Sequence, residues 1–206
     1  VGMTHNTIKL ESSISTQDLL DIIKKLNIDE SISGILVQLP LPKQIDSSVI
    51  LAAIDINKDV DGLSNNNLGA LLKGEPNFIP ATPLGVRELL QRNGVVIPGK
   101  NVVVVGRSTL VGKPLSALLS IKSDKGDATV TLAHSATTDL SSVTKTADIL
   151  IVATGLAEFI DDTMIKEGVV IIDVGINRVD DKNNKNGYKL VGDVNFESVL
   201  SKASMV

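Results

Sequence analysis

Four strand candidates in the second half of the chain constrain its fold more than any other feature. Each is a short run rich in valine, isoleucine or threonine, and helical patterns of apolar residues separate the first three. The strand candidates are residues 102–105, 128–132, 149–152 and 169–172, and the helical patterns are residues 84–91, 112–119, 140–146 and 195–203. Strands that alternate with helices form a doubly wound parallel sheet, whose inner strands are buried on both faces. The sequence predicts such an α/β domain over residues 82–206.

Residues 1–81 have a different pattern, which predicts a smaller α/β domain with a cleft between the two. Short strands are expected at residues 7–10 and 34–40. Helices are expected at residues 16–26, 47–54 and 66–73, the second capped by Asp46 or Ser47 and the third closed by Gly74. Near the other end of the chain, the polar residues 180–187 predict an exposed loop.

Composition argues against several classes of protein. The net charge is −4 and only 2% of residues are aromatic, so neither a basic footprint nor stacking rings favour nucleic-acid binding. The absence of cysteine excludes disulfides and a cysteine nucleophile, and it fits a reducing compartment. No apolar run is long enough to span a bilayer. We therefore expect a cytoplasmic protein that needs no metal, no membrane and no nucleic acid.

The two ends of the chain predict a truncated sequence. The chain begins with Val1-Gly2 instead of methionine, and it stops at Met205-Val206, directly after a helical pattern. We expect segments of the protein to be missing at both ends.

A nucleotide site is predicted where the first strand candidate runs into Gly106-Arg107-Ser108 and, four residues later, Gly112. Gly106 allows a sharp turn, Gly112 allows close packing, and the helix that follows presents free N–H groups to a phosphate. The middle glycine of the usual dinucleotide pattern is replaced by Ser108. Glycine turns also follow strands that bind nothing, so this turn alone does not decide the function.

The end of the second strand candidate indicates which dinucleotide would bind. Sites for NAD usually place an acid there to hold the ribose 2′-hydroxyl, but the sequence reads Ala133-His134-Ser135. Arg107 and Ser135, with no carboxylate, suit a 2′-phosphate. This arrangement predicts NADP. The alternative is that Arg107 pairs with a surface acid and that His134 is only a packed imidazole.

Six segments, in order, resemble one enzyme family. They are Gly34-Ile35-Leu36-Val37-Gln38-Leu39-Pro40-Leu41-Pro42, Lys58-Asp59-Val60-Asp61-Gly62-Leu63, Phe78-Ile79-Pro80-Ala81-Thr82-Pro83-Leu84-Gly85, Val103-Val104-Val105-Gly106-Arg107-Ser108 with Val111-Gly112-Lys113-Pro114, Asp173-Val174-Gly175-Ile176-Asn177, and Val191-Gly192-Asp193-Val194. Together they resemble the bifunctional methylenetetrahydrofolate dehydrogenase/methenyltetrahydrofolate cyclohydrolase family. The resemblance implies that methylenetetrahydrofolate passes a hydride to NADP, and that water then opens the methenyl product to 10-formyltetrahydrofolate. It also implies a Rossmann-like NADP domain and a homodimer.

The resemblance also implies roles for particular residues. Gln38 resembles the glutamine that supports a catalytic lysine, and Asp61 resembles the carboxylate that grips the pterin ring. Both roles suit the chemistry, since a glutamine donates and accepts and a carboxylate matches the donor edge of pterin. The alternatives are an ordinary strand-end glutamine and a turn aspartate. Val37 and Leu39 resemble the folate wall, while Thr82, Gly106, Arg107, Ser108, Ser135 and Ile176 resemble the NADP site.

One family element is absent from these 206 residues. The family places its catalytic lysine in a Tyr-x-x-x-Lys pair on an early helix, but the only tyrosine, Tyr188, is followed four residues later by Gly192. Lys9 lies in a strand pattern. The chain by itself is therefore expected to be inactive, and a non-catalytic NADP-binding homologue is the alternative function. An amino-acid or shikimate dehydrogenase is a third hypothesis, which the segments around Gln38 and Asp61 disfavour because a nucleotide site needs neither.

Overall fold

A four-stranded parallel sheet organises the second half of the protein, in a computed structural model that describes residues 2–182 and 184–206. The strands are β1 (Asn101–Val105), β2 (Thr129–Ala133), β3 (Ile149–Val152) and β4 (Val170–Asp173), in the spatial order β2-β1-β3-β4. Every neighbouring pair is parallel. The predicted doubly wound sheet is confirmed. Val1, the first residue of the expected N-terminal domain, and Asn183, in the expected loop, lie outside the described residues.

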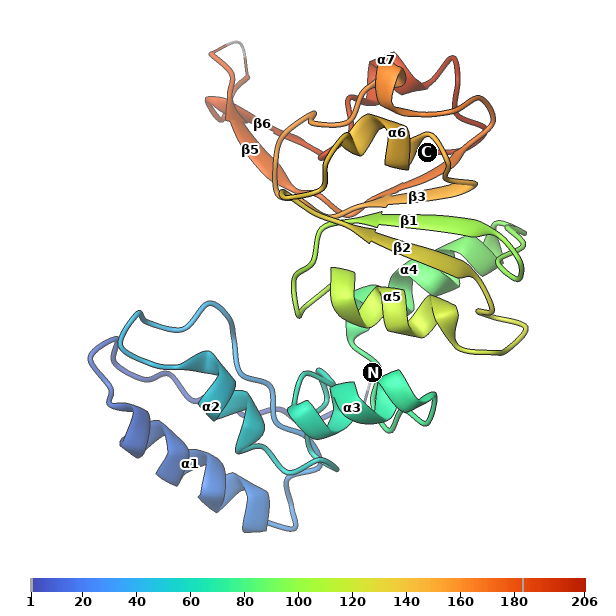
Figure 1. Ribbon diagram of the computed structural model, residues 1–206. Helices are drawn as coiled ribbons and strands as arrows, with labels where there is room; N and C mark the ends of the chain where they lie inside the picture. Colours follow the sequence, from blue (N-terminus) through green and yellow to red (C-terminus); the bar gives the residue numbers. More distant parts are fainter. Residues whose placement is uncertain (1, 183) are drawn as a thin grey trace.

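The two faces of the sheet are covered by different helices (Figure 1). On one face, Val102 and Val104 share an apolar core with α4 (Ala81–Arg92) and α5 (Gly112–Ser120). On the other face, Val103 and Val105 pack in a core with α6 (Leu140–Thr144) and the short 3-10 helix η1 (Asp162–Met164). Successive strand residues point to opposite faces, so a continuous aliphatic run supplies both cores.

The N-terminal half contains the three predicted helices, α1 (Thr16–Ile28), α2 (Ser47–Ala52) and α3 (Asn65–Lys73). Side-chain caps start each one: Ser15 for α1, Asp46 for α2 and Ser64 for α3. Gly74 ends α3 with φ +85°, as its position in the sequence predicted. These helices and the connecting segments enclose a separate small core that includes Leu19, Ile23, Ile35, Ile45, Ile50 and Ile54.

Two predicted strands in this half are wrong. Residues 7–10 form no strand and pair with none among the described residues, and their side chains are exposed. Residues 34–40 form only one parallel bridge, between Ile35 and Asp59. A strand pattern becomes a strand only when a neighbouring backbone accepts its hydrogen bonds along its length, and here the pairing is limited to that one bridge.

The C-terminal part differs from the prediction in two ways. A hairpin of β5 (Asn177–Asp180) and β6 (Tyr188–Val191) was not predicted, and the expected loop forms its tip. The predicted helix over residues 195–203 shortens to α7 (Phe196–Val199), because the following chain returns to the edge of β4. There Met205 O accepts from Ile171 N at 2.9 Å.

The boundary between the halves stays a prediction. The chain passes from the N-terminal half into α4 near residue 81, and α3 contacts α5 across the two halves. The expected boundary between residues 81 and 82, and the expected cleft, are not tested by these contacts. Within the described residues, no helix has both the length and the apolar character required to cross a membrane.

Candidate functional site

The loops that follow the four parallel strands meet at one edge of the sheet. Gly106 N donates to Ala133 O at 2.9 Å, so the turns after β1 and β2 are neighbours. Ala153 N donates to Val105 O at 2.8 Å, which joins the loop after β3 to the same place. Open α/β sheets bind ligands at this carboxyl edge.

The turn after β1 requires glycine at two positions. Gly106 has φ +124°, and a Cβ there would overlap the carbonyl oxygen of Ala153. A Cβ on Gly112 would overlap the carbonyl oxygen of Gly106. The turn is closed by Ser108, whose Oγ accepts from Val111 N at 3.1 Å. The helix α5 then begins with no side-chain cap, and Lys113 N in its first turn donates to Ser108 O at 3.0 Å.

The predicted cofactor residues at this edge are exposed and available. Within the described residues, Arg107 has no hydrogen bond or ion pair, so the alternative that it pairs with a surface acid is not what the structure shows. Ser135 lies in the neighbouring turn, and β2 ends at Ala133 with no acid directly after it. Ile176 is 80% exposed on the loop after β4, two strands away. Exposed Thr82 lies in the first turn of α4, whose opposite end leads into the start of β1.

In the N-terminal half, the segment that holds Asp61 is tightly fastened on either side of it. Lys58 Nζ donates to three carbonyl oxygens at the end of α1, those of Leu26, Asn27 and Asp29, at 2.7–3.0 Å. Cations stabilise a helix C-terminus in this way. Gly62 has φ +65°, and a Cβ there would meet the backbone of residue 78. These contacts fix the backbone on both sides of Asp61.

Asp59 also holds this segment in place, through a buried side chain. Its side chain is 1% exposed and accepts from Ser64 N at 2.8 Å, Asn67 Nδ2 at 2.8 Å and Leu63 N at 3.3 Å. These bonds hold the turn after Asp61 against the start of α3. The role of Asp59 was missed by the sequence analysis, because a sequence does not show which of two aspartates points inward.

Asp61 is the acid of this segment that has no intramolecular partner. Its side chain is half-buried, and no hydrogen bond or ion pair engages it within the described residues. Burial raises the pKa of the Asp61 carboxyl, and the nearby Asp59 charge adds to the increase. A half-buried carboxylate without donors is poised to accept hydrogen bonds from a ligand.

Gln38 and Asp61 come from neighbouring segments. One parallel bridge pairs Ile35 with Asp59, and the second segment then turns, with Gly62 N donating to Asp59 O at 3.0 Å. Gln38 is exposed, and its Nε2 donates only to the adjacent Leu39 O, at 3.0 Å. Val37 and Leu39 are half-buried beside it. That these residues share one folate site stays a prediction.

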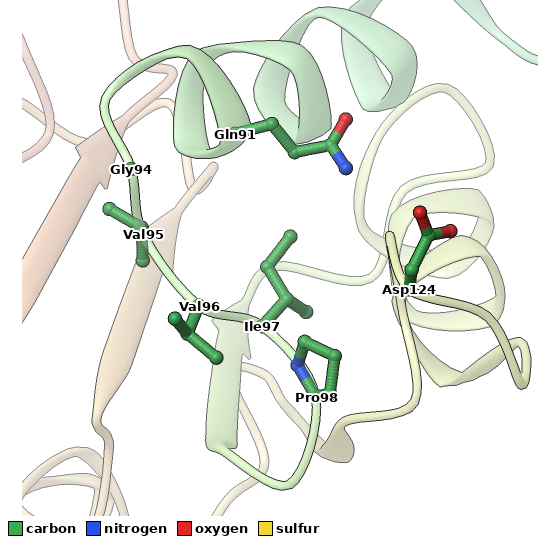
Figure 2. A pocket seen from close by; sticks show the side chains of 7 residues that line it. All are labelled: Gln91, Gly94, Val95, Val96, Ile97, Pro98 and Asp124. Carbon is green, nitrogen blue, oxygen red and sulfur yellow. The ribbon is translucent and has the colours of Figure 1, made fainter.

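A hollow of about 350 Å³ lies elsewhere, at the amino end of β1 (Figure 2). Its lining is mainly apolar and consists of Gln91, Gly94, Val95, Val96, Ile97, Pro98 and Asp124. None of the predicted site residues lines it. Within residues 2–182 and 184–206, no cluster of three or more His, Asp or Glu side chains could hold a metal ion.

Comparison with known proteins identifies the family. Residues 80–206 match the model of the tetrahydrofolate dehydrogenase/cyclohydrolase NAD(P)-binding domain, and residues 1–61 match the model of the catalytic domain. The chain is 50% identical to the bifunctional protein FolD of Flavobacterium johnsoniae, over all of this chain and 70% of that protein. It is 49% identical to the bifunctional protein FolD of Salinibacter ruber, over all of this chain and 69% of that protein.

Solved structures agree. The bifunctional FolD enzyme of Campylobacter jejuni is similar with a TM-score of 0.86 and 44% identity, over 94% of this chain and 66% of that one. The Trypanosoma brucei FolD enzyme, solved with NADP cofactor and an inhibitor, has a TM-score of 0.84 and 38% identity, over 94% of this chain and 65% of that one. This chain thus spans slightly less than two thirds of these solved chains. With both halves matched in fold and sequence, it belongs to the tetrahydrofolate dehydrogenase/cyclohydrolase family.

Proposed function

We propose that this protein oxidises 5,10-methylenetetrahydrofolate with NADP and hydrolyses the methenyl product to 10-formyltetrahydrofolate. The observation that carries the proposal is Asp61, a half-buried carboxylate without a partner on a segment whose other polar side chains are all fastened. The names of the FolD relatives and the NADP in the Trypanosoma brucei structure support the same activity. The alternative of a non-catalytic NADP-binding homologue rests only on the absence of the Tyr-x-x-x-Lys pair from these 206 residues, and the FolD relatives do not favour it.

The proposed site divides between the two halves. Asp61 accepts hydrogen bonds from the pterin edge, Gln38 supports the family's catalytic lysine, and Val37 with Leu39 forms an apolar wall. In the NADP half, the turn after β1 has no side chains at Gly106 and Gly112, which leaves the room that a pyrophosphate needs. NADP supplies the hydride acceptor. Thr82, Arg107, Ser108, Ser135 and Ile176 complete the proposed cofactor contacts.

Replacing Asp61 with asparagine tests the folate assignment. We expect Asp61→Asn to weaken tetrahydrofolate binding about 10- to 150-fold, the cost of one charged hydrogen-bonding group, while NADP binding is unchanged. Stability should not fall. Because the folded pKa of Asp61 is raised, ionisation costs folding free energy once the pH rises above 3.8 towards that pKa, and the variant removes this cost at neutral pH. Calorimetric titration with each ligand and a melting curve at pH 7 measure the three quantities.

Asp59→Asn is the matched control for this variant. It removes the same charge from a carboxylate that does have internal donors, so it should lower the melting temperature. If Asp61→Asn instead lowers the melting temperature and weakens both ligands equally, Asp61 is a structural residue and the folate assignment is wrong.

Cofactor choice is tested at Arg107. We expect wild-type protein to bind NADP more tightly than NAD, and Arg107→Ala to weaken NADP by about 1.5–3 kcal/mol, which is the worth of a charge-assisted hydrogen bond. Binding of NAD, which lacks the 2′-phosphate, should change little. Parallel titrations with both cofactors measure the difference, and equal wild-type affinities for NAD and NADP would contradict the argument from Arg107 and Ser135.

We also propose a cytoplasmic homodimer. The absence of cysteine fits a reducing compartment, and the family resemblance suggests paired subunits. Light scattering on the purified protein measures the mass in solution, and a monomer at micromolar concentration would contradict the dimer.

A further inference from the structure

A buried carboxylate that belongs to no predicted site lies beneath the carboxyl edge of the sheet. Asp193 is completely buried, and its Oδ2 accepts from Thr154 N at 2.5 Å, Thr154 Oγ1 at 3.0 Å and Gly155 N at 2.9 Å. Its Oδ1 accepts from Asn177 Nδ2 at 2.8 Å. One side chain therefore ties the loop after β3 to the loop after β4.

Asp173, at the end of β4, holds the backbone of Asp193 in return. Its carboxylate accepts from Asp193 N and Val194 N, both at 3.0 Å, and from Gly175 N at 2.9 Å. A Cβ on Gly175 would overlap the Asp193 carboxylate, and a Cβ on Gly192 would overlap the Asp173 carboxylate. The two aspartates thus form a linked clamp, in which Asp173 holds Asp193 and Asp193 holds the loop, and which fits only because both glycines lack side chains.

The loops held by this clamp border the proposed dinucleotide site. Ala153 immediately precedes Thr154, and its carbonyl oxygen lies against Gly106, the first residue of the phosphate turn. Ile176 immediately precedes Asn177. A shift of either loop would change the wall beside Gly106 or the position of Ile176.

The Asp193 carboxylate is suited to this task because it stays ionised. Burial by itself would raise the pKa of Asp193, but the hydrogen bonds from Asn177, Gly155 and Thr154 outweigh it and hold the pKa below its usual value. All the groups that face its two oxygens in these contacts are donors. A neutral carboxyl would have to turn a proton towards one of them.

We propose that Asp193 is a positioning residue for the dinucleotide: its buried carboxylate fixes loop 153–155 and Asn177, and so sets the wall of the Gly106 turn and the position of Ile176. It acts through these groups without touching the cofactor. The inference rests on the proposed NADP binding. It adds that affinity for NADP depends on a side chain buried behind the site.

Three variants test this proposal, measured with NADP well below the lowest melting temperature. Asp193→Asn keeps the shape but removes the negative charge that Thr154, Gly155 and Asn177 share, and it should weaken NADP binding about 10- to 100-fold, the cost of displaced contacts. Combining Asp193→Asn with Asn177→Asp returns one carboxylate to this pair and should recover most of the affinity. Amide hydrogen exchange at Thr154 and Gly155 should accelerate in the single variant and slow again in the double variant.

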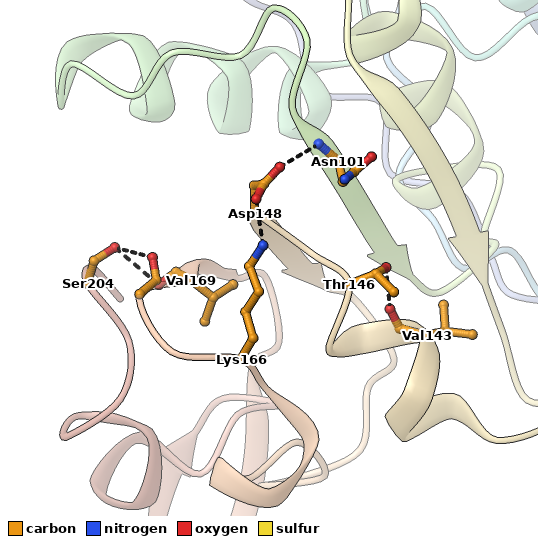
Figure 3. Close-up of polar contacts among 8 residues, drawn as sticks. Asn101, Val143, Thr146, Asp148, Lys166, Val169 and Ser204 are labelled. Atoms are coloured by element: carbon orange, nitrogen blue, oxygen red, sulfur yellow. Dashed lines mark hydrogen bonds and ion pairs between the residues drawn. The ribbon is translucent and has the colours of Figure 1, made fainter.

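Asp148→Asn is the control for a purely stabilising aspartate (Figure 3). Asp148 lies at the opposite end of the sheet, where it accepts from Asn101 N at 2.9 Å and pairs with Lys166 at 2.6 Å. The Lys166 ammonium and the Asn101 N–H hold the pKa of Asp148 below its usual value, so this variant also removes a stabilising charge. It should lower the melting temperature but leave NADP affinity unchanged.

The outcomes separate the inference from the function on which it rests. If wild-type protein does not bind NADP, the proposed function fails at that step. If wild-type protein binds NADP and Asp193→Asn binds it equally well, the positioning role is wrong. Equal losses of affinity in Asp193→Asn and Asp148→Asn, or a double variant no better than the single one, would also overturn it.

Discussion

Produced by themselves, the 206 residues are expected to bind NADP but to turn over methylenetetrahydrofolate at least about 10²–10⁴-fold more slowly than a full-length relative. That factor is the usual contribution of general acid–base catalysis. The family resemblance places the proton-moving lysine in a Tyr-x-x-x-Lys pair, and no such pair occurs in this sequence. The NADP half, in contrast, contains all four strands, the glycine turn and an unpaired Arg107.

The measurement compares this chain with the FolD protein of Flavobacterium johnsoniae under identical conditions. Dehydrogenase activity is followed by NADPH absorbance, cyclohydrolase activity by loss of the methenyl chromophore, and NADP binding by titration. Turnover by the 206 residues at the rate of the relative would mean that another group moves the proton, with Lys9 the first residue to replace. A folded chain that binds no NADP would contradict the nucleotide assignment.

Gly106→Ala should be strongly destabilising. The residue has φ +124°, a conformation that costs a non-glycine residue about 1–3 kcal/mol. The added Cβ would also overlap the backbone oxygen of Ala153, and forcing an extra group into a packed site costs about another 1–3 kcal/mol. We expect the free energy of unfolding to fall by roughly 2–6 kcal/mol, and NADP binding to be lost in whatever remains folded.

Gly69→Ala is the matched control. Gly69 lies inside α3, nothing approaches the position of its missing Cβ, and alanine is better than glycine in a helix by about 0.5–1 kcal/mol. Denaturant titration should therefore show opposite signs for the two glycine-to-alanine changes. A Gly106→Ala protein as stable as wild type would mean that the turn can relax away from Ala153.

The sheet was predictable from the sequence because its signal is local. Residues 102–105 of β1 and all of β3 are buried on both faces, so these runs are aliphatic throughout and no alternation is needed to recognise them. Helix ends were equally clear where Gly74 or Asn93-Gly94 terminates a pattern. These features depend on a few neighbouring residues and on burial alone.

The errors arose where structure depends on distant partners. Residues 7–10 have a strand pattern but no adjoining backbone, whereas polar β5 and β6 form strands because they pair with each other. Arg178 stacks 3.9 Å from the centre of the Tyr188 ring across this hairpin, a contact that single-strand patterns do not reveal. Likewise, α7 ends early because the chain after it pairs beside β4.

For the candidate site, the sequence indicated the proposed ligand contacts better than the buried residues that hold those contacts in place. Arg107 and Ser135 were predicted from their place at strand ends where no acid follows the second strand, and Asp61 from the family resemblance. Asp59 and Asp193 were missed, since their function lies in hydrogen bonds to segments up to 39 positions away in the chain. The assignments of ligand roles remain predictions, to be decided by the titrations above.

The distance between the two ends of the sheet has a consequence for how the charge of this protein can vary. The five residues of β1 span about 16 Å at about 3.3 Å per residue, roughly twice the ~8 Å over which physiological salt screens exposed charges. Exposed lysines and acids around Asp148 are thus largely screened from phosphates bound at the carboxyl edge. Their number can drift, or be redesigned to move the isoelectric point, without altering affinity for the dinucleotide.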